Sequence, residues 1–195
     1  AVAAGLQDQG VKYGDRVAVM AQNVPHYFSL LGAASLSGAV LVLINRRLST
    51  EEVRVILDDT APKVMFYEPE QREAVQDILA QCPSVQTRVV LGQSQPGELA
   101  YADLLQAGLA YPVQVPANAP YAIIHTAAVQ GRPRGAVLSQ ENLILAGLQL
   151  TQAFKLHQED ACLNLLPLYH IMGLNLALAA SLGRGRNILL PRFDP

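Results

Sequence analysis

The sequence predicts an α/β protein with a mainly parallel sheet that helices cover on both faces. Short apolar runs alternate with longer segments whose apolar residues have helical spacing. The short runs are apolar along their whole length, as in strands that are buried on both faces of a sheet. Strands separated by helices are typical of parallel sheets with right-handed crossovers.

The first half of the chain holds four predicted strands and three predicted helices. Pro25 suits the first turn of the first helix, and Gly38 lies where that helix is expected to stop. The second helix opens at Ser49 or Thr50, whose hydroxyls can cap free N–H groups. The predicted strands are 16–21, 40–44, 63–67 and 87–91, and the predicted helices are 25–37, 50–59 and 70–81.

The second half begins with a loop at 92–97, a short predicted helix at 101–106 and a proline-rich extended connector at 110–120. Ser139 is expected to cap a helix at 140–155, and its spacing to Asn142 is an imperfect capping box. We expect a first α/β subdomain over 1–156, which includes the hairpin around the candidate phosphate loop described below, and the beginning of a second subdomain over 157–195. The remaining predicted strands are 121–126, 135–138, 161–165 and 188–190, and a last helix is predicted at 173–182.

Composition and charge narrow the class of protein. A chain that is 51% hydrophobic and 15% charged predicts a packed core, and a net charge of −2 argues against a nucleic-acid-binding surface. The most apolar stretch, 171–182, is too short to span a bilayer, which needs about 20 residues. Cys82 and Cys162 lack metal-ligand spacing and predict reduced thiols in a cytoplasmic protein. The N-terminus lacks a signal-peptide pattern and a starting Met, as expected of a piece of a longer protein.

The segment 125–142, HTAAVQGRPRGAVLSQEN, is the main candidate for a ligand site. Gly131 and Gly135 let the backbone approach a phosphate closely, and Pro133 stiffens the turn between them. Arg132 and Arg134 add guanidinium groups, which pair bidentately with phosphate oxygens. The Walker pattern is not met. From these residues alone, a phosphate site and a basic surface loop both remain open.

The order of residues around this loop resembles the AMP-binding signature of the adenylate-forming enzymes. This family includes acyl-CoA synthetases, luciferases and the adenylation domains of peptide synthetases. Its signature reads Thr-Ser-Gly-Thr-Thr-Gly-x-Pro-Lys-Gly, followed by an apolar strand and Ser-His-x-Asn. The similar residues here run from Thr126 to Gly135 and from Ser139 to Asn142.

Three further stretches support the resemblance, in family order and at family-like spacing. The stretch 10–25 looks like the family's first strand and the turn after it. The stretch 38–59 looks like its GA…N-x-R-L-[ST] segment and the helix that follows, and 166–174 looks like its LP-L-(F/Y)-H-x-x-G motif. The chain is therefore similar to the first part of the family's large N-terminal domain.

The resemblance implies two sets of binding residues, and it assigns no certain catalytic group and no metal ligand. Tyr169 and His170 would wall an acyl-substrate pocket at a helix start, and Gly173 would leave room for the substrate. His125, just before the loop, is expected to be structural, and His26 is expected at the surface. Asn23 is expected to be a turn residue with a stabilising role, and Arg46 a solvated charge or an ion-pair partner. The nucleotide phosphates would be bound by Thr126, Ala127, Ala128, Val129, Gln130, Gly131, Arg132, Pro133, Arg134 and Gly135.

The loop also departs from the family pattern. Residues 127–130 (Ala-Ala-Val-Gln) replace its hydroxyl-bearing core, Arg134 stands for Lys, and Gln140 stands for His. At about 0.5–1.5 kcal/mol per hydrogen bond, three lost contacts would weaken ATP binding by about tenfold to a thousandfold. The loop is therefore either divergent and working, or degenerate.

The resemblance implies that the parent protein is an ATP-dependent carboxylic acid–CoA ligase, which uses ATP, Mg²⁺ and coenzyme A. Its small-molecule partners would be a carboxylic acid and coenzyme A, and a homodimer is one assembly left open. The family's Tyr-Gly-x-Thr-Glu segment, ribose-binding Asp and C-terminal Lys are not recognisable, so the isolated chain is expected to be inactive. One alternative is a non-catalytic AMP-binding-like domain with a degenerate loop. Another is a flavodoxin-like binding module, which leaves the 166–174 motif unexplained.

Overall fold

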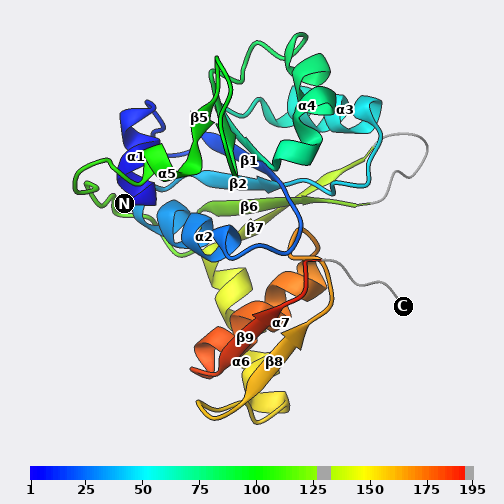
Figure 1. The fold of residues 1–195 in the computed structure, drawn as a ribbon. Helices are drawn as coiled ribbons and strands as arrows, with labels where there is room; N and C mark the ends of the chain where they lie inside the picture. The colour runs from blue at the N-terminus through cyan, green and yellow to red at the C-terminus, as the bar shows by residue number, and fades with distance from the viewer. Residues whose placement is uncertain (127–132, 192–195) are drawn as a thin grey trace.

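A computed structural model describes residues 1–126 and 133–191, whose fold is shown in Figure 1. Seven strands form one sheet in the order β5-β4-β3-β1-β2-β6-β7. Neighbouring strands pair in parallel except β6 and β7, which form an antiparallel pair at one edge. The predicted fold class is thus confirmed. The strands are β1 (Arg16–Met20), β2 (Val40–Leu43), β3 (Val64–Tyr67), β4 (Thr87–Val90), β5 (Leu99–Ala100), β6 (Pro120–His125) and β7 (Gly135–Ser139).

Helices cover both faces of this sheet, as the sequence predicts. On one face, α1 (Val2–Asp8) and α2 (His26–Ser37) contribute to a buried core. On the other face, α3 (Thr50–Thr60) and α4 (Arg72–Leu79) contribute to a second core. The sheet therefore lies as a middle layer between two sets of helices (Figure 1).

Strand β1 lies in the middle of the sheet and contributes to both cores. Val17 and Val19 belong to the core with α1 and α2, whereas Ala18 and Met20 belong to the core with α3 and α4. Successive side chains of a strand point to opposite faces, so a strand with helices on both sides is apolar at consecutive positions. This explains the continuous apolar run that predicts it.

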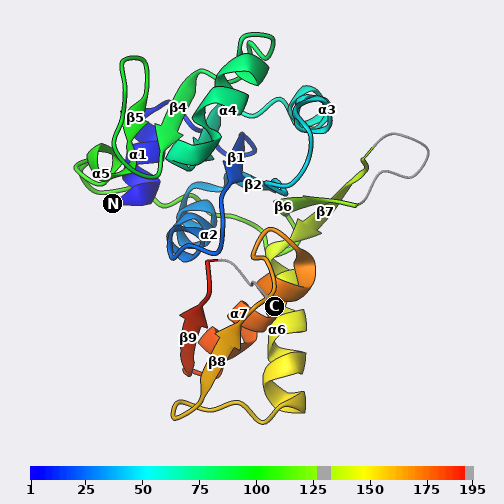
Figure 2. The same cartoon turned by 45° about the vertical axis from the view of Figure 1, so that its right-hand side comes forward.

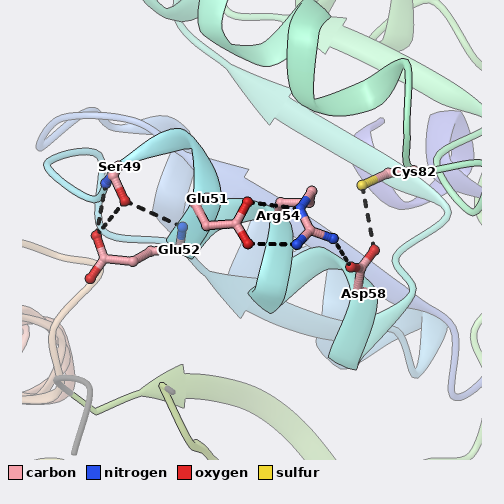
Figure 3. A network of polar contacts seen from close by, with 6 residues as sticks. All are labelled: Ser49, Glu51, Glu52, Arg54, Asp58 and Cys82. Atoms are coloured by element: carbon pink, nitrogen blue, oxygen red, sulfur yellow. Dashed lines mark hydrogen bonds and ion pairs between the residues drawn. The ribbon is translucent and has the colours of Figure 1, made fainter. Parts of the chain in front are cut away.

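The start of α3 has the predicted cap (Figure 3). The Oγ of Ser49 accepts a hydrogen bond from the N–H of Glu52 at 3.3 Å, and the Glu52 carboxylate accepts one from the Ser49 N–H at 2.9 Å. Further along the exposed side, Arg54 donates to both Glu51 and Asp58. The capping box satisfies N–H groups that no helical carbonyl can reach.

The later part of the chain adds a helix pair and a separate two-stranded sheet. Helix α6 lies alongside α7, and β8 pairs in parallel with β9 (Figures 1 and 2). Ser139 and Asn142 form a complete capping box at α6, although Asn stands in place of the usual acid or Gln. The predicted division at 156/157 falls between α6 and β8, and it stays a prediction. The bounds are α6 (Gln140–Ala153), β8 (Ala161–Asn164), α7 (Ile171–Leu182) and β9 (Arg186–Leu189).

Two short elements are absent from the sequence prediction, α1 and β5. Helix α1 has seven residues and no side-chain cap, and β5 has two residues, so neither has a clear pattern. The predicted helix at 70–81 is a 3₁₀ turn, η1 (Pro69–Gln71), followed by the shorter α4. Helix α5 (Tyr101–Leu104) and the other predicted elements match to within two residues at each end.

The two cysteines are free thiols, as the sequence predicts. Burial raises the pKa of both Cys82 and Cys162, which makes them poor nucleophiles at neutral pH. Among the helices within 1–126 and 133–191, none is long and apolar enough to cross a membrane.

Candidate functional site

A cavity of about 410 Å³ lies at the carboxyl ends of β2 and β6. In open parallel sheets, ligands bind at this edge of the strands. The cavity brings together residues of both predicted sites: Thr126 and Pro133 from the phosphate loop, and Tyr169 and His170 from the acyl-pocket motif. Its other lining residues are Leu43, Asn45, Leu48, Glu52, Ile124, His125, Ala136, Leu138 and Ile171.

The two ends of the predicted phosphate loop meet at Thr126 and Arg134. The N–H and the Oγ1 of Thr126 both donate to the Arg134 carbonyl oxygen, at 3.0 and 3.4 Å. The backbone N–H of Thr126 therefore closes the hairpin between β6 and β7, while Arg134 keeps an exposed side chain. Six predicted phosphate ligands lie outside the described residues: Ala127, Ala128, Val129, Gln130, Gly131 and Arg132.

Gly135 is the first residue of β7 and pairs with His125 of β6. A Cβ at Gly135 would lie 2.8 Å from the Ile123 Cγ2 and 3.0 Å from the His125 Nε2. The glycine thus lets the hairpin close over these two side chains. This is a packing requirement, and the predicted contact between Gly135 and a phosphate stays a prediction.

His170 is the N-cap residue of α7. Its ring Nδ1 accepts a hydrogen bond from the Met172 N–H at 3.3 Å. The backbone N–H of His170 donates to the Pro167 carbonyl oxygen at 3.0 Å. A neutral imidazole that accepts at Nδ1 carries its proton on Nε2. The exposed ring therefore caps its own helix and presents one N–H donor at the cavity wall.

Gly173 lies in the first turn of α7 and is not among the cavity-lining residues. A Cβ at this position would lie 2.2 Å from the Pro167 carbonyl oxygen and 2.7 Å from that of Leu166. The absent side chain leaves room for the chain's own backbone. Its predicted role in the substrate pocket stays a prediction.

The whole chain matches one family model, that of the AMP-binding enzyme, over residues 1–195. The chain belongs to the AMP-binding enzyme family. This confirms the resemblance seen in the sequence motifs.

Curated relatives of this AMP-binding chain are CoA ligases. It is 34% identical to a long-chain-fatty-acid–CoA ligase of Thermus thermophilus over 195 residues, which is 98% of this chain and 36% of that protein. It is also 34% identical to an indoleacetate–CoA ligase of Aromatoleum aromaticum over 200 residues, which is 99% of this chain and 38% of that protein. The chain thus spans little more than a third of these relatives.

Solved structures of similar proteins share the fold. ATP-bound MatB from Rhodopseudomonas palustris superposes with a TM-score of 0.84 at 28% identity, over 100% of this chain and 39% of that one. A fatty acyl CoA synthetase of Mycobacterium tuberculosis gives a TM-score of 0.84 at 27% identity, over 99% of this chain and 38% of that one. Both values support the same arrangement of elements.

One residue that supports the site in this AMP-binding chain is Asn23, for which sequence reasoning predicts only a local turn role. Its Nδ2 donates to the Leu166 carbonyl oxygen at 3.1 Å, and its Oδ1 accepts the Leu168 N–H at 2.8 Å. The buried amide thus ties the turn after β1 to the turn that carries Tyr169 and His170. An Asn in the turn after an apolar strand is the only sequence signal for this contact.

Charged groups also gather where β1, β2 and β3 end. The Glu68 carboxylate accepts the Gln22 N–H at 2.8 Å and lies 3.9 Å from the Arg46 Nε. Burial raises the pKa of Glu68, although Gln22 and Arg46 oppose this shift. Arg46, expected to be a solvated charge or an ion-pair partner, is therefore the partner of a buried acid.

The Mg²⁺ that the family implies finds no ligand cluster in the described ranges. Within 1–126 and 133–191, no group of three or more His, Cys, Asp or Glu side chains could hold a metal ion. The prediction that this chain supplies no metal ligand stays a prediction.

Proposed function

We propose that the protein containing this chain is an ATP-dependent ligase that joins a carboxylic acid to coenzyme A. The observation that carries this proposal is the shared cavity, where the hairpin at Thr126 and Pro133 adjoins the turn of Tyr169 and His170. Acyl-adenylate formation needs this arrangement, because the carboxylate must lie within reach of the α-phosphate. The names of the relatives, which act on a long-chain fatty acid and on indoleacetate, support the class of substrate.

The chemistry has two steps. First, a carboxylate oxygen bonds to the α-phosphorus of ATP and pyrophosphate leaves. The sulfur of coenzyme A then bonds to the acyl carbon and AMP leaves. The carboxylate is itself the nucleophile, so no side chain has to be activated. ATP is expected to bind as its Mg²⁺ complex, in which the ion would offset the negative charge of the phosphates.

The residues of this chain bind and orient the reactants. The exposed Arg134 guanidinium supplies positive charge beside the phosphates, where it pairs with their oxygens. Tyr169 and His170 line the acyl side of the cavity. The Nε2 N–H of His170 can donate a hydrogen bond to an oxyanion there. The predicted loop residues 127–132 and Gly135 belong to the same proposed phosphate site.

The test is acid-dependent ATP–pyrophosphate exchange by the natural full-length protein, with AMP release after coenzyme A is added. We expect Arg134→Ala to slow exchange by about tenfold to a hundredfold, since a hydrogen bond to a charged group contributes about 1.5–3 kcal/mol. Arg186→Ala, at an exposed position of β9, is the matched control and should leave the rate unchanged. No exchange with any fatty or aromatic acid would contradict the proposal.

The 195 residues by themselves are expected to be inactive. The family's adenine-binding, ribose-binding and C-terminal lysine segments are not recognisable in them, and the chain spans 36% of the Thermus relative. Turnover by the isolated chain in the same exchange assay would refute this.

The alternative function is a non-catalytic AMP-binding-like domain. It is favoured by one observation, the replacement of the hydroxyl-bearing core of the loop by Ala-Ala-Val-Gln at 127–130. Replacing these residues by Ser-Gly-Thr-Thr in the full-length protein separates the two functions. A large gain in ATP binding and the appearance of exchange would favour a degenerate loop, whereas exchange in the natural sequence favours a working one.

The cellular location and the binding partners of the protein are part of the proposal. The free thiols of Cys82, which is buried, and Cys162, which is partly buried, support a cytoplasmic location, where cysteines stay reduced. Coenzyme A and the acid are the expected small-molecule partners. A homodimer also remains a proposal, to be tested by sedimentation.

A further inference from the structure

His125 is a buried side chain whose ring nitrogens make no hydrogen bond within the part of the chain that the structure describes. It is the last residue of β6, and its side chain is 4% exposed. Neither Nδ1 nor Nε2 has a hydrogen-bond partner among the described residues. The residue lines the 410 Å³ cavity at the carboxyl ends of the strands. A buried polar group without a partner is unfavourable, so a site that contains one is suited to a ligand that supplies the partner.

The ring lies beside the backbone of the neighbouring hairpin strand, β7. His125 pairs with Gly135 of β7. A side chain at Gly135 would place its Cβ only 3.0 Å from the His125 Nε2. Ile123, two residues back on the same face of β6, also lies against Gly135. Gly135 therefore leaves the space that the imidazole occupies at the wall of the cavity.

The charged and titratable groups around the ring come from helix α3 and from the turn before α7. Asp59 of α3 lies 3.8 Å from Nε2 and is 67% exposed, so it is a weak partner across more than hydrogen-bond distance. Glu52 of α3 lines the same cavity, but its carboxylate already accepts hydrogen bonds from Ser49. Tyr169 and His170 line the cavity from the turn before α7.

These surroundings keep the ring neutral when no ligand is bound. Burial lowers the pKa of His125, and Asp59 opposes that shift only in part. A neutral imidazole has one N–H and one lone pair, whereas a protonated one has two N–H donors. A negative charge in the cavity would favour the protonated form.

We infer that His125 binds the oxyanion of a ligand in this cavity and takes up a proton from solvent as it does so. One N–H of the protonated ring donates to the oxyanion, and the N–H at Nε2 faces Asp59. The inference rests on the proposed function, which supplies two sources of an oxyanion: the carboxylate of the acid and a phosphate of ATP. Most of the wall is apolar, including Leu43, Leu48 and Ile124, which suits the body of an apolar acid.

The experiment is calorimetric titration of the natural full-length protein at pH 7.5 in two buffers of different ionisation enthalpy. The probes are octanoate, benzoate and ATP with magnesium, each titrated separately. We expect uptake of about one proton per bound ligand for the probe whose oxyanion reaches His125, since a neutral imidazole accepts one. Uptake with the acids points to the carboxylate, and uptake with ATP points to a phosphate.

Two variants separate His125 from the other histidines. His125→Gln should bind the same probe about tenfold more weakly and without proton uptake, because one charge-assisted hydrogen bond is lost. His157→Gln, at an exposed position of the molecule, should keep both the affinity and the uptake. A His125→Gln variant with wild-type uptake would overturn the inference.

A second measurement on the unaltered protein covers the case in which His125→Gln does not fold. The ring ¹⁵N shifts of His125, titrated with and without the probe, should show protonation at higher pH when the probe is bound. If ATP or an acid binds and these shifts stay those of a neutral ring, this inference fails while the proposed ligase function stands. If no probe binds, both fail.

Discussion

Gly173 and Gly32 both lie inside helices, but only Gly173 has no room for a side chain. A Cβ at Gly173 would lie 2.2 Å from the Pro167 carbonyl oxygen, whereas a Cβ at Gly32 meets nothing within 4 Å. We expect Gly173→Ala to lower the free energy of unfolding by about 2–3 kcal/mol, because the backbone has to move. Gly32→Ala should raise it by about 0.5–1 kcal/mol through helix propensity. Urea unfolding measures both, and similar effects at the two sites would contradict the packing at Gly173.

Two histidines, His26 which is half-buried and His125 whose side chain is buried, make stability depend on pH. Burial holds the pKa of His26 and of His125 below the ordinary value of 6.5. The unfolded chain therefore binds protons at a higher pH than the native state does, so the free energy of unfolding falls as the pH drops below 6.5. We expect His125→Gln, without ligand, to lose less stability than the wild type between pH 7.5 and 5.5.

Urea unfolding at both pH values tests this dependence. His157→Gln is the control, because this side chain is exposed and its removal should leave the wild-type loss of stability. An unchanged pH dependence in His125→Gln would show that another group is responsible.

The burial of a single histidine could not be predicted from its neighbours in the sequence. His26 is expected at the surface, yet it is half-buried, with its ring 4.4 Å from that of Tyr101 in an edge-on arrangement. His125 is expected to be structural, and the structure adds that its ring lines a cavity. Both properties depend on segments that are distant in the sequence.

At the scale of elements, Asn23 connects the turn after β1 to the turn before α7. We expect Asn23→Ala to lower the free energy of unfolding by about 1–3 kcal/mol, because the Leu166 carbonyl and the Leu168 N–H each lose a buried partner. Ligand binding in the cavity should weaken as well, since Tyr169 follows directly.

Asn118→Ala on the exposed connector is the matched control for this change. Urea unfolding and binding of the adenylation substrates would be measured side by side. Wild-type stability in Asn23→Ala would mean that the two turns are held together by other contacts.

The sequence predicts elements well where burial imposes a pattern. Strands β1 to β4 are read from continuous apolar runs, and α3 and α6 from their capping residues. The sequence does not predict α1 and β5, because these elements are too short to show a hydrophobic period. The motifs also place both halves of the candidate site, but their meeting at one cavity depends on contacts such as that of Asn23, which no local pattern reveals.

At the scale of the whole molecule, α6 carries apolar side chains that the described residues cover only in part. Leu145 is 51% exposed and Leu148 is 46% exposed, and residues three apart share one side of a helix. We expect the isolated 195-residue chain to self-associate through this face, because contiguous exposed apolar surface favours association. The double variant Leu145→Gln, Leu148→Gln should shift it toward monomer.

Sedimentation velocity over a range of concentrations measures this association. Leu109→Gln is the control, because Leu109 is 93% exposed but does not belong to α6. An equal effect of both changes would mean that total hydrophobicity, and not the face of α6, drives association.

The order of the strands has a consequence for how the chain folds. β1 lies between β2 and β3, and all three are complete once Tyr67 has been synthesised. A three-stranded centre can therefore assemble on the ribosome while β6, which completes the binding edge beside β2, is still being translated. The nascent chain gains its scaffold first and its ligand cavity last, since pairings between distant segments form slowly.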